Sequence, residues 1–146
     1  MLGLISPKNL DDNECFRWCH VRKLNPQKKD PQRIKLTNKE FVKKLDYSGV
    51  TFPVQYKDYN KIEKQNQINV NVFGYIGFFY PIYLSKEKNS IDLDLLYIEE
   101  EEKSGEGIPL APSGHYVLIT DFDRLMYSFN KHKEKNIFVS VVYIVF

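Results

Sequence analysis

Cysteine is scarce in this chain of 146 residues, which contains only two, Cys15 and Cys19. Because they lie four residues apart in a segment with a helical pattern, they are poor disulfide partners. This argues against a secreted scaffold stapled by disulfides. We therefore expect a reducing, intracellular setting, in the cytoplasm or the nucleus, where both thiols stay free to react.

Long hydrophobic runs and an excess of charge of one sign are also missing. The apolar start, Met1–Pro7, is too short for a signal peptide or a membrane span, so no membrane association is predicted. The net charge is only +2. The total charge therefore gives no case for nucleic-acid binding, although basic residues gather between Arg22 and Lys44. The hydrophobic fraction of 42% is that of a globular protein, so global disorder is excluded.

The hydrophobic pattern predicts helices first and strands afterwards. Apolar residues at intervals of three and four predict helices at Cys15–Lys23, Thr37–Leu45 and Asp58–Gln65. Alternating or continuous apolar residues predict strands at Ile68–Gly74, Phe78–Leu84, Ile91–Ile98, Tyr116–Ile119 and Ile137–Phe146. Pro81 favours an edge position for the second strand, and Asp121 would cap a short helix reaching Tyr127.

These elements predict one α+β domain spanning residues 1–146, with N-terminal helices followed by a mostly antiparallel sheet. Residues 99–114 are acidic at first and then rich in Gly, Pro and Ser, with no apolar period. A connection of this length inside a compact domain is uncommon, and we predict a flexible loop. A basic turn is expected at Asn130–Lys135.

The polar run Asp11–Asn13 leads directly into the first predicted helix and places Cys15 in its first turn. Unpaired backbone N–H groups and the helix dipole favour a thiolate there, and the thiolate is the nucleophilic form of cysteine. His115 opens a short apolar strand a hundred residues later and is the best candidate for the base. Asn13 or Asp12 could provide a donor for an oxyanion.

The group that would orient the imidazole stays open between Asp94 and Asp121. Asp121 follows His115 by six residues, about 20 Å along an unbroken strand, and is also a natural helix cap. Asp94 lies on the preceding predicted strand. If that strand pairs with the strand of His115 along its full length, Asp94 is also too far from the imidazole. No metal or other cofactor is predicted, because Cys15-x-x-x-Cys19-His20 is not a usual zinc spacing.

The cysteines and histidines also have purely structural interpretations. Cys15 could be a core thiol and His115 a surface imidazole. Cys19 is expected to be a buried apolar filler on the inner side of the helix. His20 and His132 are expected to be exposed.

Several motifs resemble the papain-like cysteine peptidase superfamily. Asp12-Asn13-Glu14-Cys15-Phe16 and His115-Tyr116-x-x-Ile119 are similar to motifs of deubiquitinases of the ovarian-tumour type and of those related to herpesviral large tegument proteins. With Lys29–Ile34 and Ile68–Tyr75, they resemble a domain carried beside the polymerase of Maverick/Polinton transposons. The similarity covers nearly the whole chain and implies a papain-like fold.

The resemblance implies a deubiquitinase-type cysteine isopeptidase, which cleaves after the C-terminal Gly-Gly of ubiquitin or a ubiquitin-like modifier. It implies Cys15 as the nucleophile, His115 as the base and Asn13 as an oxyanion donor. Asp121 would be the third catalytic residue, with Asp94 as the alternative, and Tyr116 and Trp18 would contact the substrate. Tyr116 would wall a channel that admits only glycines.

The chain departs from these families at four places. Ser113 stands where the herpesviral enzymes have an Asp two residues before the histidine, and Val117 stands where the ovarian-tumour type often has an acid. Gly105–Gly114 resembles an insertion, and Phe138–Val142 lacks the cysteines of the zinc-finger start that relatives carry there. The alternative function is a transposon-derived binding domain that keeps the peptidase fold without activity.

Overall fold

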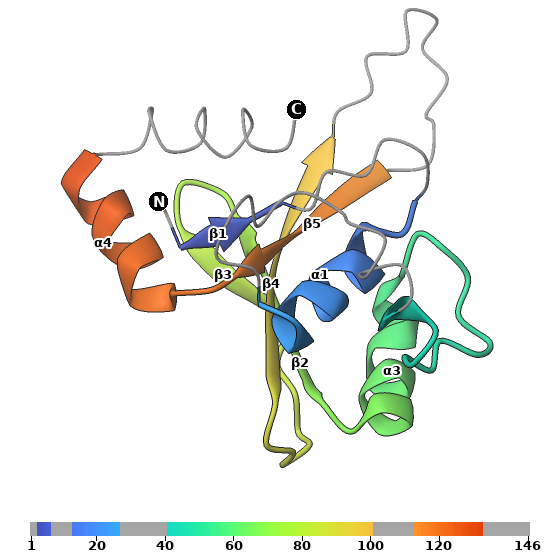
Figure 1. Ribbon diagram of the computed structural model, residues 1–146. Helices are drawn as coiled ribbons and strands as arrows, with labels where there is room; N and C mark the ends of the chain where they lie inside the picture. Colours follow the sequence, from blue (N-terminus) through green and yellow to red (C-terminus); the bar gives the residue numbers. More distant parts are fainter. Residues whose placement is uncertain (1–2, 7–12, 27–40, 101–112, 133–146) are drawn as a thin grey trace, which may run out of the picture.

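The computed structural model describes residues 3–6, 13–26, 41–100 and 113–132, and within them the fold is α+β (Figure 1). The elements in chain order are β1 (Leu4–Ile5), α1 (Cys15–Leu24), the short 3-10 helix η1 (Tyr56–Asp58), α3 (Tyr59–Asn66), β2 (Asn69–Tyr75), β3 (Phe79–Tyr83), β4 (Asp92–Glu100), β5 (Ser113–Ile119) and α4 (Phe122–His132).

The described strands form one five-stranded sheet in the order β1-β5-β4-β2-β3. β2 runs parallel to β4, whereas the β1–β5, β4–β5 and β2–β3 pairs are antiparallel. The sheet is therefore mixed, and the prediction of a mostly antiparallel sheet is corrected. β3 lies at an edge, as Pro81 indicated, because proline cannot donate to a ladder on both sides.

Asparagine side chains explain why β4 returns beside β2 rather than beside β3. The Asn69 amide donates to the Asn89 carbonyl and to Asp92 Oδ1, both at 2.8 Å. Asn89 in turn donates its backbone N–H to Asn69 Oδ1 at 2.9 Å. These bonds tie the segment before β4 to the start of β2, and β4 then continues in the direction of β2.

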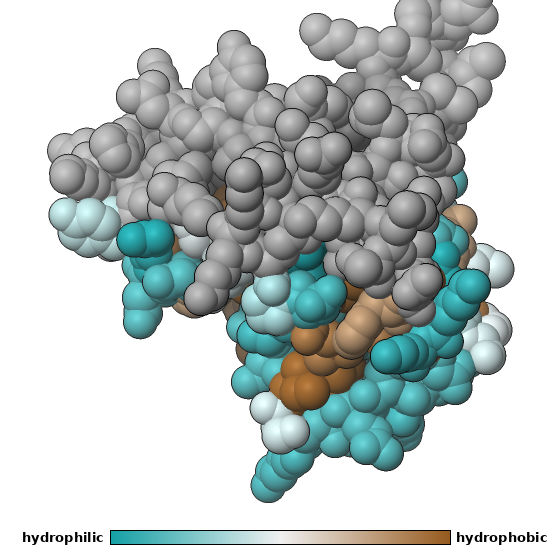
Figure 2. Space-filling view, in the orientation of Figure 1, coloured by the Kyte–Doolittle hydropathy of each residue, from teal (hydrophilic) through white to brown (hydrophobic). Residues whose placement is uncertain are grey.

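The sheet buries apolar side chains on both faces, with α1 and α3 on one side and α4 on the other (Figure 1). The alternation of β5 divides its residues between the two cores. Tyr116 and Leu118 pack on the α1 face, while Val117 and Ile119 pack with Leu125 of α4 on the opposite face. In the space-filling view, hydrophilic side chains cover most of the described surface on this side, and hydrophobic ones gather in one area below the centre (Figure 2).

Most predicted elements of the described ranges are confirmed, with shifted ends. α1 and α3 match the helical patterns, and Phe16, Cys19 and Ile62 are fully buried as predicted. The predicted loop 99–114 is shorter than expected, since β4 extends to Glu100 and β5 begins at Ser113. α4 continues to His132, where a basic turn was predicted.

Other predictions lie outside the described residues: the strand at Ile137–Phe146, the helix start at Thr37–Glu40, the Lys29–Ile34 motif and residues 101–112 of the predicted loop. Among the helices that the structure describes, none combines the length and the apolar character needed to cross a membrane.

Candidate active site

Cys15 is the first residue of α1, as the sequence predicted. Glu14 occupies the N-cap position, but its carboxylate pairs with the guanidinium of Arg17 instead of capping the helix. The thiol therefore lies at the positive end of the α1 dipole, with no acidic side chain in the first turn of the helix. Cys15 is only 8% exposed.

The two cysteines of α1 bind the same residue of β5. The Tyr116 backbone N–H donates to Cys15 Sγ, and Cys19 Sγ donates to the Tyr116 carbonyl, each at 3.5 Å. β1 pairs only with Leu118 and Ile119, so it does not extend to Tyr116. The thiols thus hold α1 against the part of β5 that β1 leaves uncovered. Cys19 is fully buried, as predicted, and burial together with the charge of Cys15 raises the pKa of its thiol.

His115 is next to this contact in the chain, and its side chain leaves β5 on the face opposite that of Tyr116. It pairs with Ile98 of β4, which packs on the α4 face, whereas Tyr116 packs on the α1 face. The imidazole is half-buried, and its Nε2 forms a hydrogen bond with Ser6 Oγ at 3.1 Å. The structure therefore brings the His115 backbone close to Cys15 and bonds the imidazole to Ser6 through Nε2.

Ser6 is a site residue that the sequence analysis missed. It is buried and directly follows β1, whose pairing with β5 carries it toward His115. No local pattern marks it, because the contact joins residues 109 positions apart. Burial lowers the pKa of His115, so the imidazole is neutral at pH 7 and can accept a proton.

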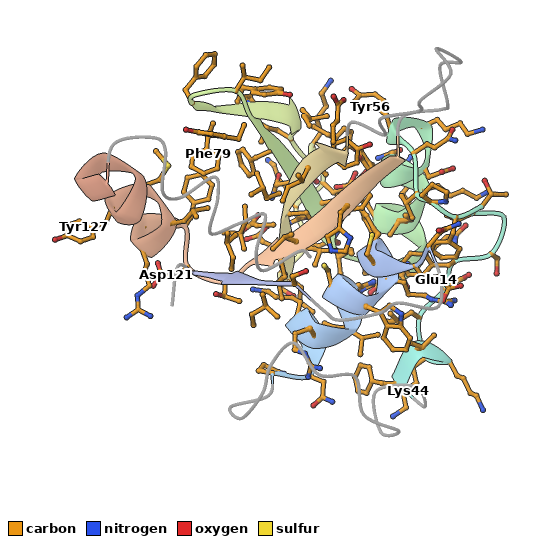
Figure 3. All side chains as sticks on the ribbon, turned by 90° about the horizontal axis from the view of Figure 1, so that it is seen from above. Glu14, Lys44, Tyr56, Phe79, Asp121 and Tyr127 are labelled. Carbon is orange, nitrogen blue, oxygen red and sulfur yellow. The ribbon has the colours of Figure 1, made fainter. Side chains whose placement is uncertain are left out.

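Neither candidate for the third catalytic residue is placed at His115. Asp121 Oδ1 accepts the Arg124 backbone N–H at 2.9 Å and so caps α4. Figure 3 shows Asp121 at the start of α4, well separated from Glu14 at the start of α1. Asp94 Oδ1 accepts from the Asn71 amide at 3.0 Å. Asp94 lies four residues before the strand partner of His115, about 13 Å along β4.

Asn13 and Trp18 have contrasting surroundings. Asn13 is exposed and precedes α1 by two residues, close to the thiol end of the helix. Trp18 is buried, and its indole nitrogen finds no hydrogen-bond partner among the described residues. The structure thus places Trp18 in the packing of α1 rather than on an open surface.

The expectation that His20 is exposed is wrong. His20 is 1% exposed, and its Nδ1 forms a hydrogen bond with the Tyr47 hydroxyl at 2.8 Å. Burial lowers its pKa to about 4. The sequence spacing indicates this burial, because His20 follows the buried Phe16 by four residues and so lies on the same side of the helix. The side chain of His132 is outside the described part of the structure.

A cavity of about 570 Å³, which we name the tyrosine cleft, opens between the sheet and the start of α3. Tyr116 fixes its inner wall, since its hydroxyl donates to the Val54 carbonyl at 2.9 Å and bonds the Tyr59 hydroxyl at 2.7 Å. The residues lining the cleft are Pro53, Val54, Gln55, Tyr56, Tyr59, Tyr80, Ile82, Tyr97, Glu99, Gly114 and Tyr116.

The tyrosine cleft is close to the thiol. Burial raises the pKa of the Tyr97 phenol, and the negative charges of Glu99 and Cys15 act in the same direction. Burial also raises the pKa of Tyr116, with contributions from Tyr59, Tyr97 and Cys15. Tyr116 lines the cleft, and its backbone N–H donates to Cys15 Sγ at 3.5 Å, so the arrangement can place a bound chain beside a sulfur nucleophile.

Within the described residues, no group of three or more His, Cys, Asp or Glu side chains is arranged to hold a metal ion. Comparison of the chain with known protein families, with curated proteins and with solved structures finds no match.

Proposed function

We propose that this chain is a thiol-dependent isopeptidase of papain-like fold, which cleaves after the C-terminal Gly-Gly of ubiquitin or a ubiquitin-like modifier. One observation supports the proposal most. Cys15 lies in the first turn of α1, against the peptide N–H that follows His115 and beside the tyrosine cleft. The sequence motifs around both residues resemble those of papain-like deubiquitinases.

In the proposed reaction, the modifier's tail lies extended in the tyrosine cleft and presents its last carbonyl to Cys15. His115 takes the proton of the Cys15 thiol, and the thiolate attacks the carbonyl carbon. The tetrahedral oxyanion accepts hydrogen bonds from N–H groups at the start of α1, with Asn13 close by. The C–N bond breaks, the amine leaves with a proton from His115, and a thioester remains. Water, giving its proton to His115, then breaks the C–S bond and releases the modifier.

Ser6 holds only the Nε2 atom of His115, so Nδ1 is the ring nitrogen that would serve Cys15 in the proposed reaction. Ser6 is then the group that positions the imidazole in the resting enzyme, where a carboxylate was predicted. Since burial favours the neutral imidazole, His115 begins the cycle as a base rather than as a cation.

The test is covalent labelling by ubiquitin that carries a C-terminal electrophile such as a vinyl sulfone. We expect one adduct on the wild type, located at Cys15 by mass spectrometry, and no adduct on Cys15→Ala. Cys19→Ala is the matched control, because Cys19 is the other buried thiol of α1 and should leave labelling intact. Absence of labelling in the wild type, or its persistence in Cys15→Ala, contradicts the proposal.

The contact between His115 and Ser6 favours a second function, a binding domain with an inactive peptidase fold. In that case the imidazole stays on the face opposite Tyr116, and Cys15 serves only to hold α1 on β5. Titration with unmodified ubiquitin distinguishes the two functions. Binding by the wild type and by Cys15→Ala, without any labelling, would favour the binding domain.

A further inference from the structure

The helix α3 and the segment before it present a local excess of positive charge. Residues 41–67 contain five lysines but only three acidic residues. All five lysines are exposed, and they are Lys43, Lys44, Lys57, Lys61 and Lys64. Among the described residues, none of them forms an ion pair. The net charge of +2 for the whole chain therefore conceals a basic surface on this side of the protein.

The acidic residues of this segment compensate little of that charge. Asp58 and Glu63 are buried, and their carboxylates accept hydrogen bonds inside the fold. Asp46 is the exposed acid, and its carboxylate accepts the backbone N–H of the residue two positions later at 3.1 Å. Glu87, a half-buried acid of the loop after β3, accepts from the Asn60 amide of α3 at 3.3 Å and lies between two exposed lysines. Five exposed lysines of residues 41–67 thus face solvent with one exposed acid among them.

Hydrogen bonds bring the lysines from both parts of the segment to the same side of the protein. The Asp46 backbone N–H donates to Asn66 Oδ1 at 2.7 Å, and the Asn66 amide donates to the Asp46 carbonyl at 2.8 Å. Lys61 Nζ donates to the Gly49 carbonyl at 3.3 Å. Residues 43 and 44 therefore lie beside the C-terminal end of α3. We call the five lysines the basic face, and the described surface over α3 is hydrophilic in the space-filling view (Figure 2).

The basic face suits a regular row of phosphates. Lys57, Lys61 and Lys64 follow one another at intervals of four and three residues, so they share one side of the helical segment and span about 10 Å along it. A nucleic-acid duplex presents a phosphate about every 3.4 Å on each strand, so about three phosphates match this row. Lysine is a compact charge with three donors, which suits phosphate oxygens. Residues 41–67 contain no arginine, whose planar fork reads base edges, so binding should not depend on base sequence.

We infer that the basic face binds the phosphate backbone of a nucleic-acid duplex, independently of the base sequence. This function is separate from the proposed cleavage, because the face belongs to α3 and the residues before it, whereas Cys15 lies on α1. Cys15→Ala should therefore bind a duplex as the wild type does. A failure of ubiquitin labelling and a failure of duplex binding remain separate results.

The test is fluorescence anisotropy with two fluorescein-labelled duplexes of about 16 base pairs, one of DNA and one of RNA, at NaCl concentrations from about 25 to 150 mM. Both should bind, because both offer a regular row of phosphates. For DNA, about three to five phosphate contacts predict that log K falls with log salt at a slope of about −3 to −4.5. If neither duplex binds at the lowest salt concentration, the inference is overturned.

Substitutions locate the binding on the basic face. Lys64→Gln should reduce the magnitude of the DNA salt slope by about 1, and Lys57→Gln combined with Lys64→Gln should reduce it by about 2. Arg124→Gln is the matched control, because it removes one charge from an exposed residue of α4, on the opposite side of the sheet (Figure 1). This variant should keep the slope of the wild type.

Two results on the DNA duplex would overturn the inference. If Lys64→Gln and Arg124→Gln lose affinity equally, binding depends on the total charge and not on the basic face. If polyglutamate displaces the labelled duplex as well as unlabelled duplex does, the face recognises acidic chains in general and not the phosphates of a nucleic acid.

Discussion

Burial of the His20 imidazole makes the stability of the protein depend on pH. The pKa of His20 is about 4 in the folded chain, against an ordinary value of 6.5 that the unfolded chain should show. Between these values the unfolded chain binds more protons, so the free energy of unfolding rises with pH. Stability is therefore complete above about pH 6.5 and decreases as the pH falls toward 4.

We expect His20 to account for about 2 kcal/mol of the stability lost between pH 7 and pH 5, because about 1.5 pH units of this range lie below the ordinary pKa of 6.5 and each contributes about 1.4 kcal/mol. Urea denaturation at the two pH values measures this loss. His20→Gln should lose about 2 kcal/mol less than the wild type over this range. His115→Gln is the control, because burial also lowers the pKa of His115. If His20→Gln loses as much stability between pH 7 and pH 5 as the wild type, the prediction is contradicted.

At the residue scale, sequence reasoning located the nucleophile candidate but not the environment of the base. Cys15 was predictable because a polar run and a helical pattern are local features. The partner of His115 was not, since Ser6 reaches it only through the pairing of β1 with β5. Asp121 was identified correctly as a helix cap, again from neighbouring residues.

At the scale of elements, one buried carboxylate joins α3 to the β2–β3 hairpin. Glu63 of α3 is fully buried and accepts the Val70 backbone N–H at 3.0 Å. It also accepts hydrogen bonds from the hydroxyls of Tyr83 and Ser85. Burial raises the pKa of Tyr83 to about 12, and the hydrogen bond to Glu63 and its charge act in the same direction.

We predict that Glu63→Ala lowers the free energy of unfolding by about 3 kcal/mol or more, because four donors, on Asn60, Val70, Tyr83 and Ser85, lose their buried acceptor. Thermal or urea denaturation followed by circular dichroism measures the change. Glu87→Ala, at a half-buried acid of the loop after β3, is the matched control and should cost less than about 1 kcal/mol. If the two variants lose equal free energy of unfolding, the hydrogen bonds of Glu63 contribute no more to stability than those of Glu87.

Element types could be predicted from the sequence, whereas strand neighbours could not. The alternation in Ile68–Gly74 and Ile91–Ile98 identifies two strands with a buried face. It does not specify that these strands run side by side and parallel. That arrangement depends on the hydrogen bonds between Asn69, Asn89 and Asp92, which form only in the folded chain.

At the scale of the whole molecule, the two cores share one sheet, so they should unfold together. Leu125 of α4 is fully buried against the face opposite α1, whereas Trp18, the only tryptophan, lies on α1. Small domains in which layers share a sheet usually unfold in one step. A change on the α4 side should therefore be visible at Trp18.

We expect Leu125→Ala to destabilise the protein by about 2–5 kcal/mol and to shift the Trp18 fluorescence transition and the circular dichroism transition equally. Tyr127→Ala, at 64% exposure on the same helix, should change stability by less than about 0.5 kcal/mol. Two separate transitions in Leu125→Ala would show that α4 and its core unfold independently of the rest.

The contact between α1 and β5 also has a consequence for the protein during its synthesis. The hydrogen bond from Tyr116 to Cys15 joins residues 101 positions apart. At about 5–20 residues per second, a ribosome needs roughly 5–20 s to make the intervening chain. Throughout that interval α1 lacks β5, and the hydrogen bonds of both cysteines to Tyr116 cannot form, so we expect the thiols to be more accessible to oxidants and electrophiles. The nascent chain is therefore more open to modification of its thiols than the folded protein, in which the same thiols are buried.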